Sequence, residues 1–326
     1  MTSEISRRAQ ELVAQRLPEA QQLGRSLVDL IDDPEAFTRM LRAGLEHLSD
    51  EGYAAEQERV APGSGAVIGA RWPLISAVSR QLRRPLAEGS SSSAIWLAQR
   101  LATEKIRELR LFALVPLAAS LADDPERTWQ VLRRLGRSAT DWISVDSMAD
   151  LVARGILLEP YRWAELEQLV YSASRWERRL VGTTVARMPH AVPTRRRATL
   201  ETDRALMLIE SSMGDREPDV QKALSWALRE WVKADPVAVA RLLRDETAIA
   251  VRASDGYRAW VIRDALSAQP ADLAADLRHR LDGIRRRPGA PSTSTASAAA
   301  AGFTSVVGLA DRAVAQQGER MARVSA

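Results

Sequence analysis

The chain has 326 residues, 46% of them hydrophobic, which is long enough for one large domain or two ordinary ones with a sizeable core. It has no Cys and only three His, which are far apart, so disulfides, thiolate nucleophiles and zinc–cysteine sites are excluded, and we expect neither a metal nor another cofactor. The net charge is only +4, yet 43 of the 46 basic residues are Arg, a composition that suits a nucleic-acid partner but also follows from a GC-rich genome.

The N-terminal sequence, MTSEISRRAQELV, lacks the apolar segment of a signal peptide. No run further along approaches the roughly 18 apolar residues that a membrane span needs. We therefore expect a soluble, cytoplasmic protein without a membrane partner, associated with the nucleoid if the source is a bacterium. Nothing in the sequence demands more than a monomer.

Helical periodicity dominates the chain, and Pro beside an acidic residue marks the predicted helix starts. These breaks are DDPE (32–35), ADDPER (122–127), REPDV (216–220) and KADPVAVA (233–240). Their spacing fits helical pairs of a few tens of residues. We predict an all-α solenoid of stacked antiparallel helical pairs, similar to HEAT repeats, with a concave basic face. An ordinary helical bundle is the alternative.

The stretch TDWISVDSMADLV (140–152) is predicted to be helical and to combine a core face with a polar pair. Its apolar face consists of Val145, Met148, Ala149 and Val152. Trp142 and Asp146 are four residues apart, so their side chains lie one above the other on a neighbouring stripe. Packing does not explain this stripe, although a chance pair at the rim of the core would look the same.

The next unusual helix is predicted within SASRWERRLVGTTVARM (172–188). Trp176 and Arg179 are three residues apart, and Arg175 and Arg178 flank them. An Arg-rich helix face is usually only solvated. Together with an aromatic side chain, it also suits the alternating phosphates and sugars of nucleic acid.

A third helix is predicted within DVQKALSWALREWVKADP (219–236), and it carries one continuous basic-aromatic face. This face consists of Lys222, Trp226, Arg229 and Lys233, whereas Ala223, Ala227, Leu228 and Trp231 point elsewhere. We expect Trp231, like Trp163 and Trp129, to be a core residue. Trp226, with three basic neighbours, is predicted either to make cation–π contacts with them or to contact an anionic polymer that has apolar patches, as nucleic acid does.

From Gly283 the composition changes to GIRRRPGAPSTSTASAAAAG, which we expect to be a disordered basic linker. The following FTSVVGLADRAVAQQGERMARV has helical spacing at Phe303, Val306, Val307 and Ala310. A frayed tail and a helix that docks on a partner or caps the solenoid are both open. We expect a helical lead over 1–35, a main domain over 36–282, and a flexible linker with a short amphipathic helix over 283–326.

The segments WISVDSMAD, RWERRLVGTTV and VQKALSWALREWVKADPVAV, in this order, resemble the AlkD family of DNA alkylation repair glycosylases. The resemblance covers roughly 36–282 and is strongest over 140–240. The upstream stretches IGARWPLISAV (68–78) and IRELRLFALVPLA (106–118) resemble weaker early-repeat motifs of the same family.

The resemblance implies roles for several residues. It places Trp142 and Asp146 at the lesion, makes Arg179 the phosphate-contacting residue of the active site, and makes Trp226 a second aromatic wall. Some members have a Trp directly before the motif Trp, where this chain has Asp141, which leaves the pocket shape and the lesion preference open. We expect the neighbouring side chains to bind DNA: Trp176, Arg175, Arg178, Lys222, Arg229 and Lys233.

The expected activity is therefore hydrolysis of the N-glycosidic bond of purines alkylated at N3 or N7 in duplex DNA. Such purines are cationic and leave without strong acid catalysis, so one carboxylate that stabilises the sugar cation and orients water is enough. The resemblance implies that no deep base-flipping pocket is needed, and an open site of this kind would tolerate bulky adducts as well as methyl groups. The alternative is a non-catalytic DNA-binding or scaffold protein with the same fold.

Overall fold

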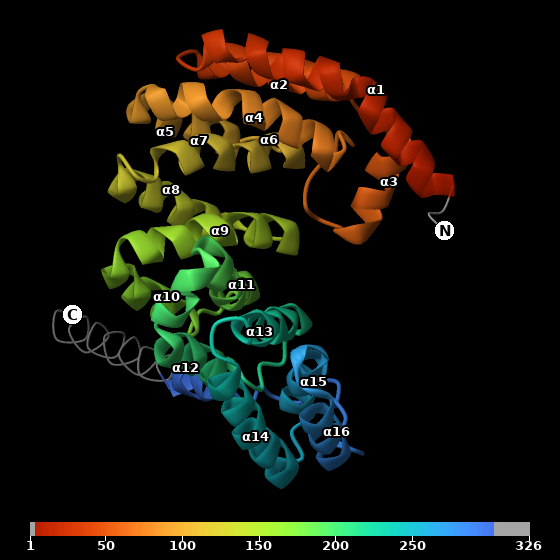
Figure 1. Cartoon of the computed structure of the whole chain (residues 1–326), viewed down its shortest axis with the longest axis vertical. Helices are drawn as coiled ribbons and strands as arrows, with labels where there is room; N and C mark the ends of the chain where they lie inside the picture. The colour runs from red at the N-terminus through yellow and green to blue at the C-terminus, as the bar shows by residue number, and fades with distance from the viewer. Residues whose placement is uncertain (1–3, 303–326) are drawn as a thin grey trace, which may run out of the picture. The chain divides into compact units, whose positions relative to one another are not determined.

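The computed structural model describes residues 4–302, which form two compact units divided between Pro160 and Tyr161 (Figure 1). All regular structure in this part of the chain is helical, apart from two isolated β-bridges. The predicted all-α class is confirmed, and the concave basic face stays a prediction. The helix expected from Phe303 onward lies outside the described residues.

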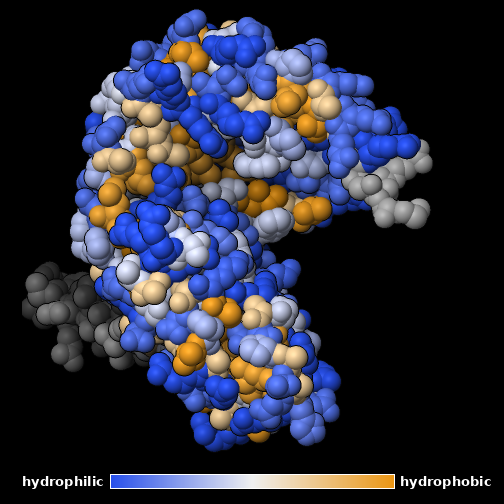
Figure 2. Space-filling view, viewed as in Figure 1, coloured by the Kyte–Doolittle hydropathy of each residue, from blue (hydrophilic) through white to orange (hydrophobic). Residues whose placement is uncertain are grey.

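The first unit is a two-layered stack of helices. Its elements are α1 (Glu4–Ser26), η1 (Val28–Leu30), α2 (Pro34–His47), α3 (Glu51–Val60), α4 (Trp72–Glu88), α5 (Ser91–Ala102), α6 (Arg107–Phe112), α7 (Leu114–Ser120), α8 (Pro125–Ser138) and α9 (Trp142–Leu158). Helices α1, α4, α7 and α9 pack in succession as one layer, and α2, α5 and α8 form the other. Figure 2 shows that hydrophilic residues dominate the visible surface of α1, which buries Ala20 on its inner side.

The second unit has the same two-layer arrangement. Its elements are η2 (Pro160–Arg162), α10 (Trp163–Leu169), α11 (Arg175–Ala191), η3 (Thr194–Thr199), α12 (Thr202–Ser212), α13 (Pro218–Trp231), α14 (Pro236–Ala253), α15 (Gly256–Ala265), η4 (Leu266–Ala268) and α16 (Ala271–Arg280). Helices α11, α13 and α15 pack side by side, and α12, α14 and α16 form the second layer. Contact between alternate helices is the packing expected of stacked helical pairs.

The Asp-Pro sequences start helices for a simple hydrogen-bonding reason. The side chains of Asp33, Asp124 and Asp235 accept hydrogen bonds from the backbone N–H three residues later, at 3.0, 3.2 and 2.9 Å. In each case Pro occupies the first helical position, where its missing N–H is not needed. The predicted starts of α2, α8 and α14 are therefore confirmed.

The three Trp residues assigned to the core are buried as predicted. Trp129, Trp163 and Trp231 expose at most 4% of their surface. The indole Nε1 of Trp231 also donates a 2.7 Å hydrogen bond to the carbonyl of Val185, which joins α13 to α11. This satisfied donor lets a large polar-tipped side chain occupy the core.

The expectation of disorder after Gly283 is corrected for the described residues of that segment. Residues 283–297, which we call the strap, pack on the second unit. The hydroxyl of Tyr257 donates to the carbonyls of Arg287 and Ala290 at 3.0 and 2.9 Å, and Ser294 is buried. A polar composition alone predicts disorder, but it does not reveal partners that lie about 30 residues or more away in the sequence.

Candidate functional site

The first part of the candidate site is the N-terminal end of α9, which Asp141 fixes. Its buried carboxylate accepts hydrogen bonds from the backbone N–H of Ser144 at 2.9 Å and from the hydroxyl of Ser144 at 2.7 Å. Arg110 lies 3.8 Å from the same carboxylate. Asp141 is therefore the N-cap of α9, and a Trp at this position would remove the cap.

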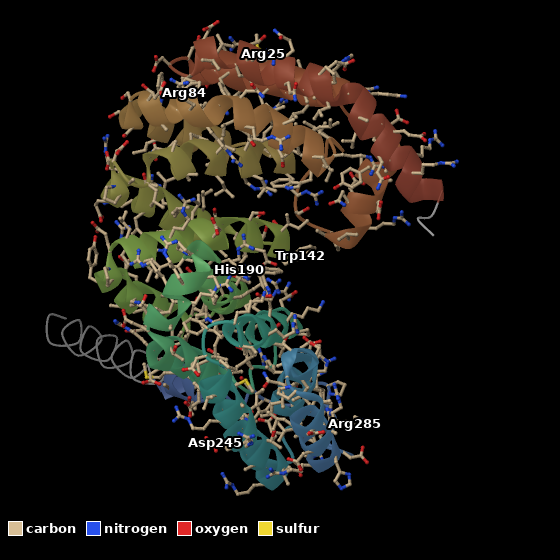
Figure 3. The ribbon with its side chains drawn as sticks, in the orientation of Figure 1. Arg25, Arg84, Trp142, His190, Asp245 and Arg285 are labelled. Carbon is tan, nitrogen blue, oxygen red and sulfur yellow. The ribbon has the colours of Figure 1, made fainter. Side chains whose placement is uncertain are left out.

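Trp142 is the first residue of α9, as labelled in Figure 3, and Asp146 follows one turn later. Both side chains are half-buried. The face predicted to enter the core does so, because Val145, Met148, Ala149 and Val152 are all buried. Packing thus fixes the helix so that the Trp142–Asp146 stripe lies at the rim of the core.

A cavity of about 230 Å³ lies along the next stripe of α9, where Ile143 and Ser147 form part of its wall. Tyr53, Trp72 and Phe112 supply aromatic surface to the same wall. Trp72 is 61% exposed although it is large and apolar, so it is a candidate binding residue. The sequence analysis did not identify Trp72 as a binding residue. The available signal was the Trp-Pro pair in IGARWPLISAV, which places this Trp at the start of a helix.

The charged side chains in the wall of this cavity, Arg107 and Glu108, form hydrogen bonds with other groups of the protein. The guanidinium of Arg107 donates to the hydroxyl of Ser64 and to the side-chain oxygen of Gln57, both at 3.1 Å. The carboxylate of Glu108 accepts from the backbone N–H of Gly69 at 2.8 Å. Neither this cavity nor a second one of about 210 Å³ near Asp141 is lined by Trp142 or Asp146.

The second unit holds the basic part of the predicted site, starting with Arg175 at the first position of α11. Its guanidinium lies 4.6 Å from the centre of the Trp176 ring, a cation–π contact. It also lies 3.7 Å from a carboxylate oxygen of Glu217 and 3.8 Å from one of Asp219. The side chain remains 47% exposed, so Arg175 can reach an anionic ligand.

Arg178 and Arg179 are used differently, because both tie α11 to the segment before and at the start of α13. Arg178 donates to the buried carboxylate of Asp215 at 2.7 Å and to the carbonyl of Ser172 at 2.8 Å. Arg179 is only 6% exposed and donates to the backbone carbonyl of Asp219 at 2.6 Å. Both side chains therefore join α11 to the segment around the start of α13, and Arg175 is the exposed Arg of this helix end.

The face predicted on α13 exists, but its cations differ in what they contact. Trp226 is half-buried and Lys222 is exposed, with no ion pair to any described residue. Arg229 forms an ion pair with Asp264 of α15, and Lys233 forms one with Glu230. Within the described chain, Lys222 is thus the cation of this face left for an external partner.

A feature that sequence reasoning missed lies on α15. Trp260 and Asp264 have the same four-residue spacing as Trp142 and Asp146, in WVIRD and WISVD respectively. The guanidinium of Arg286 lies 4.8 Å from the centre of the Trp260 ring. The repeated spacing was the available signal.

Two further observations concern metal ligands and membrane-spanning helices. Over the described chain, no set of three or more His, Asp or Glu side chains is grouped as metal ligands would be. No helix in residues 4–302 has both the length and the apolar character for crossing a membrane.

Comparisons with known proteins place these observations in a family context. The family model described as DNA alkylation repair enzyme matches residues 41–268. Among solved structures, a predicted DNA alkylation repair enzyme from Enterococcus faecalis superposes with a TM-score of 0.51 at 18% identity, covering 60% of this chain and 89% of that one. At this identity the likeness shows the fold alone. No curated protein matches the sequence.

Proposed function

Because the chain belongs to the DNA alkylation repair enzyme family, we propose that it is a DNA glycosylase for cationic purines. Its substrates are purines alkylated at N3 or N7 in duplex DNA, such as 3-methyladenine and 7-methylguanine, and bulky adducts at the same positions. The observation that carries the proposal is the Trp142–Asp146 stripe at the start of α9, inside the family-matched residues.

The chemistry requires little acid catalysis, which agrees with a single carboxylate. An alkylated purine carries a formal positive charge and departs as a neutral base when its bond to C1′ breaks. The bonding electrons leave with the base, so the sugar becomes an oxocarbenium-like cation that water attacks. A fixed carboxylate at Asp146 lowers the energy of this cation and accepts a hydrogen bond from the attacking water.

Trp142 forms the wall beside the sugar in this proposal. Its half-buried ring lies one turn before Asp146 and offers an aromatic face to the developing positive charge. Following what the family resemblance implies, we propose that the damaged base is not drawn into a deep pocket; neither of the two cavities described near α9 is lined by Trp142 or Asp146. Undamaged bases are neutral and leave too slowly under such limited assistance.

The second unit supplies DNA contacts in this proposal. Arg175, Lys222 and Lys233 are the exposed members of its predicted binding set, and Trp176 is half-buried. Arg179, to which the resemblance assigns a phosphate contact, is nearly buried. We therefore propose that Arg179 positions the start of α13 through the Asp219 carbonyl and that Arg175 contacts the phosphate.

The test is base release from methylated duplex DNA by the full chain, scored as free 3-methyladenine and 7-methylguanine. We expect Asp146→Asn to retain DNA binding and to lose most base release. Asp150→Asn is the matched control, because Asp150 lies one turn further along α9, is also half-buried, and faces Arg154 at 3.8 Å. Equal activity of wild type, Asp146→Asn and Asp150→Asn would contradict the role of Asp146.

The same experiment separates the glycosylase from a non-catalytic DNA-binding protein. Wild type that binds methylated duplex but releases no more base than buffer would support the non-catalytic alternative.

A further inference from the structure

The strap lies beyond the family-matched residues and is anchored to the second unit at two places. Near its start, the hydroxyl of Tyr257 donates to two strap carbonyls, at 3.0 and 2.9 Å. Near its end, the backbone N–H of Thr293 donates to the carbonyl of Gly214 at 3.0 Å, and the hydroxyl of Thr293 donates to the carboxylate of Asp255. The strap is therefore an integral part of the second unit, held by hydrogen bonds near both of its ends.

Two glycines make room for the strap. A Cβ at Gly256 would lie 2.0 Å from the carbonyl oxygen of Arg285, which is a steric clash with backbone. A Cβ at Gly214 would lie 2.1 Å from the hydroxyl oxygen of Thr293, and Gly214 has a φ of +87°, which favours glycine. Both anchoring points thus require a residue without a side chain.

The anchored strap places Arg286 over helices α13 and α15. Its guanidinium stacks on the ring of Trp260 and donates to the side-chain oxygen of Gln221 at 3.1 Å. The residue is exposed, and its other N–H groups have no hydrogen-bond partner among the described residues. Because the Arg286 guanidinium is held in position and still has N–H groups available, it can donate hydrogen bonds to an anion.

A second guanidinium lies further along the same two helices. Arg229 donates to the hydroxyl of Ser225 at 3.4 Å and pairs with Asp264. Ser225 is one turn after Gln221, and Asp264 is one turn after Trp260. The two guanidinium groups therefore follow one another along the α13–α15 seam, whose accessible residues are Arg229 on α13 and Trp260 and Asp264 on α15. Gln221 and Ser225 are buried beneath this seam and hold the two guanidinium groups in place. One helical turn is about 5.4 Å.

Positive charge is in excess at the start of the strap. Arg285, labelled in Figure 3 beside α15 and α16, is exposed together with Arg286 and Arg287. Asp282 is the acidic partner of Arg285, at 3.7 Å, and both side chains are highly exposed. Burial, followed by the positive charge of Arg285, lowers the pKa of nearby Arg263. Such a field attracts a polyanion.

We infer that the strap and the α13–α15 seam form a binding surface for the sugar-phosphate backbone of duplex DNA, with Arg286 as a phosphate contact. Phosphates suit the free edge of the guanidinium, and the aromatic surface of half-buried Trp260 suits the sugars between them. The inference rests on the proposed function only in taking DNA as the partner. It adds a segment outside the family-matched residues to the interface.

The test is equilibrium binding of the full chain to a short undamaged duplex, followed by fluorescence anisotropy over a range of salt concentrations. We expect Arg285→Ser/Arg286→Ser to weaken binding several-fold and to reduce the slope of log affinity against log salt by about 1 to 2, because each lost phosphate contact removes about one counterion release. The matched control is Arg195→Ser/Arg196→Ser, which removes the same charge from exposed residues of η3.

Several outcomes would overturn the inference: no binding by wild type, no change in the strap variant, or equal changes in the strap and control variants. Arg286→Lys separates charge from packing. If Arg286 contacts phosphate, Arg286→Lys keeps most of the salt slope, whereas a Lys variant that matches Arg286→Ser would show that packing on Trp260 is responsible.

Base release measured on the same preparations separates this inference from the proposed activity. The expected slope change without any base release by wild type would support the strap surface and contradict the glycosylase. If wild type releases base but the strap variant binds DNA as tightly as wild type does, the glycosylase is supported and the strap surface is contradicted.

Discussion

Helices α9 and α15 carry the same Trp-x-x-x-Asp spacing, but their neighbours give the two pairs different chemical character. On α15, Arg286 covers the ring of Trp260, and Arg229 pairs with Asp264. On α9, no described cation lies over the ring of Trp142, and the pair sits beside a buried face at the rim of the core. Spacing along a helix therefore places two side chains together, whereas the adjacent elements decide what the pair can do.

The largest expected difference between the two pairs is in base release. We predict that Asp146→Asn lowers the rate of 7-methylguanine release by about 100-fold or more, the usual effect of removing a group that stabilises transition-state charge. At saturating enzyme, where a change in DNA affinity does not limit the rate, Asp264→Asn should stay within about twofold of wild type, since Asp264 lies on α15 beside Arg229 and not on α9. Comparable losses of base release in both variants would mean that Asp146 has no special role in catalysis relative to Asp264.

The next largest effect concerns the buried ionisable side chains that support the start of α15. Arg258 pairs with both Glu246 and Asp255, and burial raises the pKa of Glu246 to about 7. The folded protein then holds a proton that the unfolded chain has lost, so stability is highest below the ordinary pKa of a Glu and falls as the pH rises towards 7.

We predict that this fall amounts to about 1 to 3 kcal/mol between pH 5 and pH 7.5 and is largely absent in Glu246→Gln. Thermal unfolding of both proteins across this range measures it. A parallel pH dependence in wild type and Glu246→Gln would show that Glu246 does not titrate there.

We expect Trp142 to contribute to catalysis and Trp260 to contribute to DNA binding. Trp142→Ala is expected to slow base release by about tenfold with little change in affinity for undamaged DNA, because a cation–π contact contributes about 1 kcal/mol or more where solvent is displaced. Trp260→Ala is expected to weaken that affinity and leave base release at saturating enzyme nearly unchanged. Single-turnover kinetics together with anisotropy distinguishes these outcomes, and the reverse pattern would exchange the two assignments.

The smallest expected effect is at the end of the strap. Thr293→Val removes the hydroxyl that donates to Asp255 and should cost about 1 kcal/mol of stability. Ser292→Ala, which removes a 3.1 Å hydrogen bond to the carbonyl of Gly214, serves as the comparison. Chemical denaturation measures both, and an unchanged midpoint in the two variants would show that the end of the strap contributes nothing to stability.

Local features of this fold were predictable from the sequence because their causes are local. Asp33, Asp124 and Asp235 start helices through hydrogen bonds that span three residues. The buried face of α9 follows from helical periodicity, and the burial of Trp231 follows from its small and apolar neighbours on α13.

The use of the arginines was not predictable, since it depends on distant partners. Arg178 pairs with Asp215 and Arg229 with Asp264, at separations of 37 and 35 residues. Nothing in the local pattern distinguishes them from Arg175, which stays accessible. The placement of the strap escaped prediction for the same reason, because Asp255 and Gly214 lie far upstream of Thr293.

The clash that a side chain at Gly256 would make with Arg285 also has a practical consequence for anyone who shortens this protein. A recombinant fragment ended at residue 268, where the family match stops, would strip away the chain that Gly256 accommodates. The carboxylate of Asp255 and the hydroxyl of Tyr257 would lose their strap partners. A boundary drawn from homology would therefore cut through a folded module, and expression trials should retain residues up to at least 297.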